Sequence, residues 1–147
     1  MFTMKICFFN PDVRPFFLCA LFFFTLVISA CSNNNETKPA PLGNLTALEN
    51  LAVSYTEVSG HFPMNVRSLP PQQKREFLEQ VFKKSGYDYT ATIITMGNSP
   101  LDNSNKNQKD LAELVLLPTV GISNEAVSDI YSDEEMQALN KIQAALR

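Results

Sequence analysis

The chain has 147 residues, a formal net charge of −3, one histidine and three cysteines. A mildly acidic chain argues against a nucleic-acid-binding protein, because such a surface needs a basic patch or stripe. The same charge argues against a surface that binds anionic membranes by electrostatic attraction.

The first thirty residues have the pattern of a secretory signal peptide. A region with Lys5 and Arg14 precedes the uncharged apolar run 15–30, which ends in small residues. A retained membrane helix is the alternative. This run is shorter than the minimum of about 17 residues for a span, and polar Ser32–Asn35 cannot extend it. We therefore expect residues 1–30 to be removed.

The end of this run, Ile28-Ser29-Ala30-Cys31, consists of an aliphatic residue, two small residues and a cysteine, and a polar tract follows. It resembles the lipobox of bacterial lipoproteins. The resemblance implies diacylglyceryl transfer to the Cys31 sulfur, cleavage between Ala30 and Cys31, and acylation of the new amino terminus, for example with palmitate. Two or more acyl chains anchor a protein stably in a bilayer.

The residue after Cys31 is Ser32. In the lipoprotein family an Asp at this position tends to retain the protein at the inner membrane. The resemblance therefore implies an outer-membrane protein that faces the periplasm, if the source is Gram-negative. Cys7 and Cys19 leave with the signal and Cys31 carries lipid, so we expect no thiol for a disulfide, a metal site or a nucleophile.

A polar segment follows the lipidated cysteine. Residues 32–43 (SNNNETKPAPLG) contain two prolines and a glycine and have no apolar periodicity. Together with Cys31, residues 31–43 are predicted to form a flexible tether. Residues 44–147 have the length of a single globular domain.

Apolar side chains at three- and four-residue spacing predict three amphipathic helices in this domain. These helices are 46–58 with Leu45, Leu48, Ala52 and Tyr55 as its inward face, 70–86 with Phe77, Leu78, Val81 and Phe82, and 132–147 with Met136, Leu139, Ile142 and Leu146. Thr46 and Glu49 have the spacing of a capping box, as do Ser132 and Glu135. Gly86 is the expected stop of the second helix.

The segment 87–96 (YDYTATIITM) fits two structures. Its alternating pattern favours a strand, whereas Tyr89, Ile93 and Met96 share a face of a helix with Asp88 as N-cap. We predict a mainly α domain. The alternative is an α+β domain with a strand–helix–strand unit at 62–96.

Two further segments complete the domain. The Asn-rich stretch 97–108 is predicted to be a surface loop, and 110–117 is predicted to be a buried short helix or strand before Pro118.

Few residues are candidates for chemistry. His61 lies in a predicted loop without a second histidine or a free cysteine, which a metal site would need. Glu76 and Glu79 share a helix face and are expected to form a solvated ion-pair surface with neighbouring basic residues rather than flank a substrate. Asp102 and Asp110 lack the spacing of a calcium loop. We assign no catalytic residue, metal site or cofactor.

Tyr87, Asp88 and Tyr89 are the candidate partner surface, because tyrosine is enriched at protein interfaces. The competing interpretation is that Tyr87 and Tyr89 cover the helix that contains Phe77 and Phe82, and this use of aromatic residues is the commoner one.

We predict a lipid-anchored cell-envelope protein without enzymatic activity that binds or positions another envelope protein. At the level of class it is similar to pilotin-like and accessory lipoproteins of secretion or conjugation machines. The alternatives are a cell-wall hydrolase or its regulator, and a periplasmic ligand-binding module.

Overall fold

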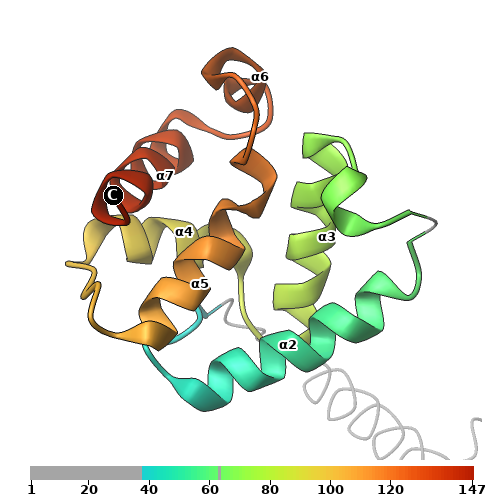
Figure 1. Cartoon of the computed structure of the whole chain (residues 1–147), viewed down its shortest axis with the longest axis horizontal. Coiled ribbons are helices and arrows are strands. Elements are labelled where there is room, and N and C mark those ends of the chain that lie inside the picture. The colour runs from blue at the N-terminus through green and yellow to red at the C-terminus, as the bar shows by residue number, and fades with distance from the viewer. Residues whose placement is uncertain (1–37, 63) are drawn as a thin grey trace, which may run out of the picture. The chain divides into compact units, whose positions relative to one another are not determined.

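Helices are the regular elements of residues 38–62 and 64–147, the part of the chain that the computed structural model describes (Figure 1). In chain order they are α2 (Leu45–Ser59), the 3-10 helix η2 (Val66–Ser68), α3 (Pro71–Lys84), α4 (Tyr89–Asn98), α5 (Lys106–Leu116), the 3-10 helix η3 (Leu117–Thr119), α6 (Asn124–Ser128) and α7 (Asp133–Ala145). These residues include no strand. The prediction of a mainly α domain is therefore confirmed, and the α+β alternative at 62–96 is wrong.

The turn between α3 and α4 explains why 87–96 is helical. Gly86 has a φ of 80°, and the Tyr87 N–H bonds to the Phe82 carbonyl at 2.9 Å, as in a Schellman motif. The Asp88 carboxylate then accepts a hydrogen bond from the Ala91 N–H at 2.7 Å and caps α4. These two signals favour a helix over the alternating pattern. A helical α4 also leaves residues 62–67 without a neighbouring strand to pair with.

Caps also set the ends of the other helices. Asn44 caps α2 by accepting from the Ala47 N–H, so the predicted capping box at Thr46 is wrong. Asn105 caps α5, which therefore begins inside the stretch predicted as a loop over 97–108. The capping box of Ser132 and Glu135 at the start of α7 is confirmed.

The core is built around α3. Its four inward residues, Phe77, Leu78, Val81 and Phe82, are completely buried. Ile93 and Met96 of α4, Leu111 and Val115 of α5, and Ile142 of α7 are buried to the same degree. Burial of each such side chain stabilises the fold by about 1.5–3 kcal/mol.

Two helix pairs make the most extensive contacts. α4 packs against α7, and α2 packs against α3, which it crosses at a steep angle in Figure 1. A Cβ built on Gly97 of α4 would lie 2.5 Å from both Cα and Cβ of Ala138 in α7, so these two helices approach too closely for any side chain at Gly97.

The segment just before α2 belongs to the domain. Ala40 is 1% exposed, and its N–H donates to the Thr92 hydroxyl of α4 at 2.9 Å. The Lys38 carbonyl accepts from the Asp88 N–H at 2.9 Å. The predicted tether 31–43 therefore extends too far, because 38–43 is held by α4. Its first part, residues 31–37, lies outside the described residues.

Candidate functional site

The residues expected to anchor the protein lie outside the described part of the chain. These are the lipobox-like Ile28, Ser29 and Ala30 and the predicted lipidation site Cys31. None of the helices within residues 38–62 and 64–147 combines the length and the apolar character needed to cross a bilayer.

The candidate partner surface at Tyr87, Asp88 and Tyr89 is not an open surface. Tyr89 is 2% exposed and its ring packs against Phe82, with centroids 5.3 Å apart. Tyr87 is half-buried against the core, and Asp88 is occupied as the cap of α4. The competing interpretation, that the tyrosines cover the α3 helix, describes Tyr89 correctly. A partner would not reach this side chain without unfolding the core.

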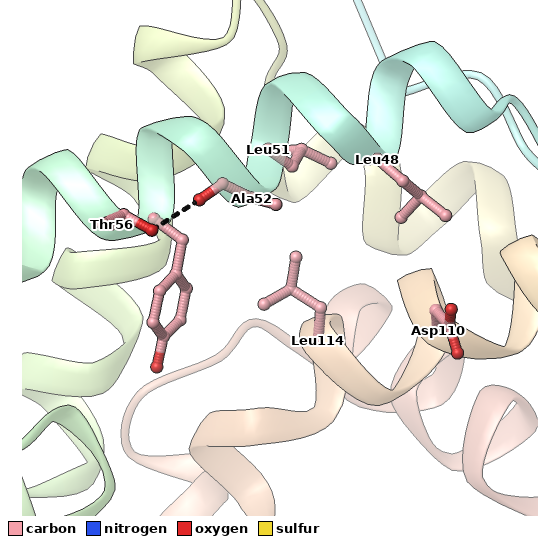
Figure 2. Close-up of a pocket in the computed structure, with 7 residues that line it drawn as sticks. Leu48, Leu51, Ala52, Thr56, Asp110 and Leu114 are labelled. Atoms are coloured by element: carbon pink, nitrogen blue, oxygen red, sulfur yellow. Dashed lines mark hydrogen bonds between the residues drawn. The ribbon is translucent and has the colours of Figure 1, made fainter.

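An apolar groove lies between α2 and α5 and holds about 440 Å³. Its lining consists of Leu48, Leu51, Ala52, Tyr55 and Thr56 from α2 and Asp110 and Leu114 from α5. Figure 2 shows Leu48 and Leu114 pointing into the gap from opposite sides. The groove is open to solvent, and most of its accessible lining is carbon. The groove is therefore an open, mostly apolar depression between the two helices.

Some of the α2 residues that line this groove were predicted from the sequence to lie in the core. The residues of α2 that are buried are Ala47, Leu51, Ser54 and Val58. The predicted inward face contains Leu45, which is 58% exposed, and Ala52, which is also exposed, with Leu48 and Tyr55 half-buried between them. The prediction of that inward face is therefore wrong for Leu45 and Ala52, whereas Leu48 and Tyr55 do pack against the core. The stripe borders the open groove.

Charged side chains of both signs are present on the two helices that form the groove, since α5 carries Lys106 and Lys109 as well as Asp110 and Glu113. α2 carries Glu49 and Glu57 and has no basic residue, and Asp110 of α5 is part of the lining. Asp110 pairs with Lys106 at 2.6 Å, and Glu57 pairs with Lys84 at 2.6 Å. Both pairs are solvent-exposed, and such pairs contribute little to stability.

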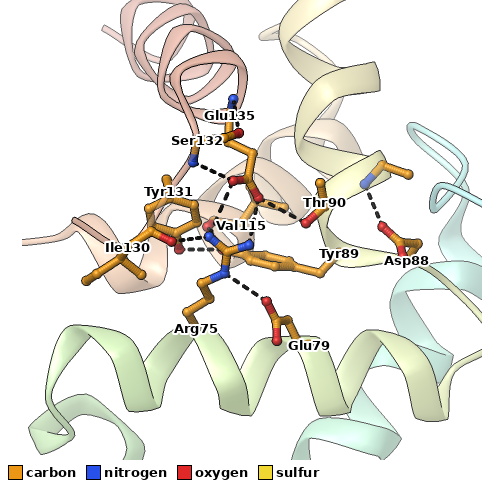
Figure 3. Close-up of polar contacts among 11 residues, drawn as sticks. Arg75, Glu79, Asp88, Tyr89, Thr90, Val115, Ile130, Tyr131, Ser132 and Glu135 are labelled. Atoms are coloured by element: carbon orange, nitrogen blue, oxygen red, sulfur yellow. Dashed lines mark hydrogen bonds and ion pairs between the residues drawn. The ribbon is translucent and has the colours of Figure 1, made fainter. Parts of the chain in front are cut away.

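A second cluster, which we call the Arg75 network, joins α3, α4 and α7 (Figure 3). The Arg75 guanidinium donates to Glu79 and to Glu135, each at 2.8 Å, and also to the Ile130 carbonyl. Its Cζ lies 4.5 Å from the centre of the Tyr131 ring, a cation–π contact. The guanidinium thus has partners on several sides.

Glu135 is the buried acceptor of this network. Its side chain is 4% exposed and accepts from the Thr90 hydroxyl at 2.9 Å and from the Ser132 N–H at 2.8 Å, besides Arg75. Burial by itself would raise the pKa of Glu135. The hydrogen bonds from Ser132 and Thr90 and the charge of Arg75 outweigh burial, so the pKa of the Glu135 carboxyl lies below its ordinary value. The carboxylate is therefore ionised at neutral pH.

Two tyrosines extend the network into the core. The Tyr89 hydroxyl donates to the Val115 carbonyl at 2.9 Å and lies 3.1 Å from the Tyr131 hydroxyl. Burial raises the pKa of Tyr131 to about 12 and that of Tyr89 well above its ordinary value, so both stay neutral. The polar groups of the Arg75 network bond to one another, and Glu135 and Tyr131 are both buried. Such a network is suited to holding helices in place.

Sequence reasoning found only the local part of this network. The solvated pair on the α3 surface is confirmed for Arg75 and Glu79, which are four residues apart. The contact of Arg75 with Glu135 spans 60 residues and was missed. Tyr131 was also missed, because a single aromatic residue between two helices carries no periodic signal.

The remaining candidates do not come together. His61 is exposed in the loop after α2, and Glu76 is exposed on α3. Asp102 accepts from the N–H and hydroxyl of Ser104, in a local turn. Within the described ranges no three His, Cys, Asp or Glu side chains are grouped as a metal site would require.

Comparison with protein families, with curated proteins and with solved structures finds no match to this chain.

Proposed function

We propose that this protein is a lipid-anchored component of the bacterial cell envelope whose helical domain binds or positions another protein. The anchoring is supported by the sequence Ile28-Ser29-Ala30-Cys31, which stands at the end of the uncharged run 15–30. A domain that begins by residue 38 would lie a few residues from the lipid, and therefore close to the bilayer surface.

The protein-binding part of the proposal is supported by the contrast between the two clusters. The Arg75 network places its polar groups against one another, with Glu135 and Tyr89 buried. The groove between α2 and α5 leaves Leu48, Tyr55 and Leu114 only partly buried instead. Apolar area that the domain leaves open is available to stabilise a complex with a second protein. We therefore favour a binding role over catalysis.

Anchoring is tested on the full chain by replacing single cysteines. We expect metabolic labelling with an alkyne-tagged palmitate, and the mass of the mature protein, to show acylation and an amino terminus at Cys31. Cys31→Ser should abolish the label and leave residues 1–30 attached. Cys19→Ser is the matched control, because it removes a cysteine of the predicted signal and should be labelled like the wild type. An unlabelled wild type that retains residues before Cys31 would refute the anchoring.

The binding role is tested by crosslinking in intact cells, followed by purification from envelopes. We expect a protein to co-purify with the wild type and to be depleted with Cys31→Ser, since an unprocessed chain is not presented in the same way. A wild type that reproducibly crosslinks to no protein would refute the binding role, whether or not the lipid is present.

A further inference from the structure

We infer that one end of the helical domain rests on the bilayer that holds the lipid anchor. This end, which we call the lysine end, consists of Lys38 and of residues 83–88, which end α3 and lead into α4. The inference rests on the proposed anchoring at Cys31 and names the surface of the domain that contacts the lipid headgroups.

The chain enters the domain at the lysine end. The Lys38 carbonyl accepts from the Asp88 N–H at 2.9 Å, just beyond the end of α3. Two residues later, Ala40 is buried and its N–H is bonded to the Thr92 hydroxyl of α4. Lys38 itself is exposed. Any link between the domain and a lipid at Cys31 therefore starts at this end.

The link is short compared with the domain. Only residues 32–37 separate Cys31 from Lys38, and a chain of this length spans at most about 25 Å when it is fully extended. A compact domain of about 110 residues is about 35 Å across. If the domain were turned over, Lys38 would lie farther from the bilayer than the link can reach. The end opposite Lys38 therefore cannot rest on the bilayer.

Charged side chains are distributed unequally along α3. Lys83 and Lys84 lie in its last turn, a few residues before the Asp88 that binds the Lys38 backbone. In the first half of α3, Glu76 and Glu79 line a cavity of about 250 Å³ together with Asp129, which follows α6. The two ends of α3 are about 20 Å apart along its axis, at 1.5 Å per residue.

The negative charge continues beyond the first half of α3. Residues 120–140 contain five acidic side chains and no basic one. Arg75 joins this segment to α3, because it donates to the Ile130 carbonyl and to Glu135. We call this region the acidic end. In Figure 1, α6 lies at the top of the domain, whereas the cyan start of the described chain lies below, near α2.

The lysine end itself is close to neutral. α2 passes beside it and carries Glu49 and Glu57, and Glu57 pairs with Lys84 at 2.6 Å. Lys38 and Lys83 are exposed, and neither forms an ion pair within the described residues. Two lysines at this end are therefore available to bind lipid phosphate groups.

The difference between the two ends favours contact through the lysine end over contact through a side of the domain. A bilayer with anionic lipids attracts basic side chains near its surface and repels acidic ones. With the lysine end on the headgroups, the acidic end lies about 20 Å farther out, beyond the Debye length of about 8 Å. The negative net charge of the chain does not oppose this contact, because it is concentrated at the acidic end.

The test measures which end of α3 lies near the headgroups. Gln73 and Gln80 are exposed residues of α3 on one face, two turns or about 10 Å apart. Each is replaced by cysteine in the full chain, purified in its acylated form and labelled with a fluorophore. With Cys31 acylated and residues 1–30 removed, the new cysteine is the one free thiol.

The labelled proteins are placed in phosphatidylcholine bilayers with about 30% phosphatidylglycerol and a spin label on the lipid headgroups, which quenches nearby fluorophores. We expect quenching of the label at Gln80→Cys to be at least about twofold stronger than at Gln73→Cys, because of the difference of about 10 Å in depth.

A matched pair of charge variants tests the lysines. Lys83→Glu and Lys74→Glu change the net charge equally and lie on the same helix, but Lys74 belongs to its first turn. We expect Lys83→Glu to lower quenching of the Gln80→Cys label at least about twofold, because an acidic side chain is repelled by the lipid. We expect Lys74→Glu to change it by less than about 20%, since it lies beyond the Debye length. Circular dichroism checks that both variants fold.

Three results would overturn the inference. The first is equal quenching at the two label positions, or stronger quenching at Gln73→Cys. The second is an equal effect of Lys83→Glu and Lys74→Glu. The third is a crosslink to an envelope protein that Lys83→Glu removes while the quenching stays unchanged, which would assign the lysine end to a protein partner.

Failure of the inference is distinguishable from failure of the proposed function. A wild type that carries no acyl chain at Cys31 reacts with the fluorophore and takes up no alkyne-tagged palmitate, and the anchoring then fails together with the inference. If the wild type is acylated but both labels are quenched equally, the anchoring stands and only the orientation is wrong.

Discussion

The contact of α4 with α7 and the contact of α2 with α5 are built in opposite ways. At the first, Gly97 lies so close to Ala138 that no Cβ fits, and Thr90 is tied to the buried Glu135. At the second, Leu48 and Leu114 face a gap that holds about 440 Å³. Small residues and a buried charge thus close one contact, whereas large apolar residues leave the other open. We infer that the closed contact holds the fold together and that the open one is available to a partner.

The largest expected effect comes from removing the buried acceptor of the closed contact. Glu135→Ala leaves the Arg75 guanidinium with fewer partners and removes the acceptor for Thr90 and for the Ser132 N–H. We expect the free energy of unfolding to fall by about 3 kcal/mol, measured by urea denaturation.

Glu134→Ala is the control for this variant. Glu134 also lies in the first turn of α7, but it is exposed, so only its interaction with the helix dipole is lost. We expect a loss of about 0.5 kcal/mol. Equal losses for the two variants would mean that the Arg75 network does not stabilise the domain.

A methyl group at Gly97 tests the close approach of the same two helices. In Gly97→Ala the new Cβ would meet the Cα and Cβ of Ala138 at 2.5 Å, so α4 and α7 must move apart. Overpacking of this kind costs about 1–3 kcal/mol, offset in part by the better helix propensity of alanine. We expect a net loss of about 1–2 kcal/mol in urea denaturation.

Gly60→Ala is the matched glycine substitution. Gly60 follows α2 with a φ of −64°, and the nearest atom to an added Cβ is the Glu57 carbonyl oxygen at 3.5 Å, an ordinary contact. We expect no loss of stability there, or a small gain, because the unfolded chain becomes less flexible. A Gly97→Ala protein as stable as Gly60→Ala would contradict the close packing of α4 and α7.

The pH dependence of stability tests the charge of Glu135. Its pKa in the folded protein lies below the ordinary value of about 4.5, so the carboxylate stabilises the fold at pH values above 4.5. This contribution is lost as the pH falls from about 4.5 through the lower folded pKa. We expect the stability difference between wild type and Glu135→Gln to be constant above about pH 5.5 and to shrink towards pH 3.

The comparison with Glu135→Gln separates this group from the other carboxyls, which titrate in both proteins. Glu134→Gln is the control, since its side chain makes none of the contacts of the Arg75 network. A difference between wild type and Glu135→Gln that is the same at pH 3 and pH 7 would contradict the lowered pKa.

Sequence reasoning succeeded where the interacting residues are close in the chain. The capping box of Ser132 and Glu135 lies within one turn, and at the end of α3 the Gly86 N–H donates to the Lys83 carbonyl. Such local signals predicted the mainly helical class and the positions of α3 and α7. They also contained the correct alternative for 87–96, in which Asp88 caps a helix.

Contacts between distant segments account for what was missed. Ser54 is buried in α2 because the Ser85 hydroxyl donates to it at 2.8 Å. A polar residue at that position made the stripe with Ala52 appear to be the inward face. In the same way, Ala40 is held by the Thr92 hydroxyl, 52 residues away, so a polar stretch that looked like a tether belongs to the domain.

The smallest expected effect comes from adding apolar atoms at the open contact. Ala52→Leu places a larger side chain at an exposed position that lines the groove. We expect the free energy of unfolding to rise by about 0.5 kcal/mol or less. Val53→Leu, outside the groove lining, should change the free energy of unfolding even less.

By contrast, Ala138→Leu at the closed contact should lower the free energy of unfolding by about 2–3 kcal/mol through overpacking. If Ala52→Leu destabilised the domain as strongly as Ala138→Leu in urea denaturation, the groove would be closed in solution, and the contrast between the two contacts would fail.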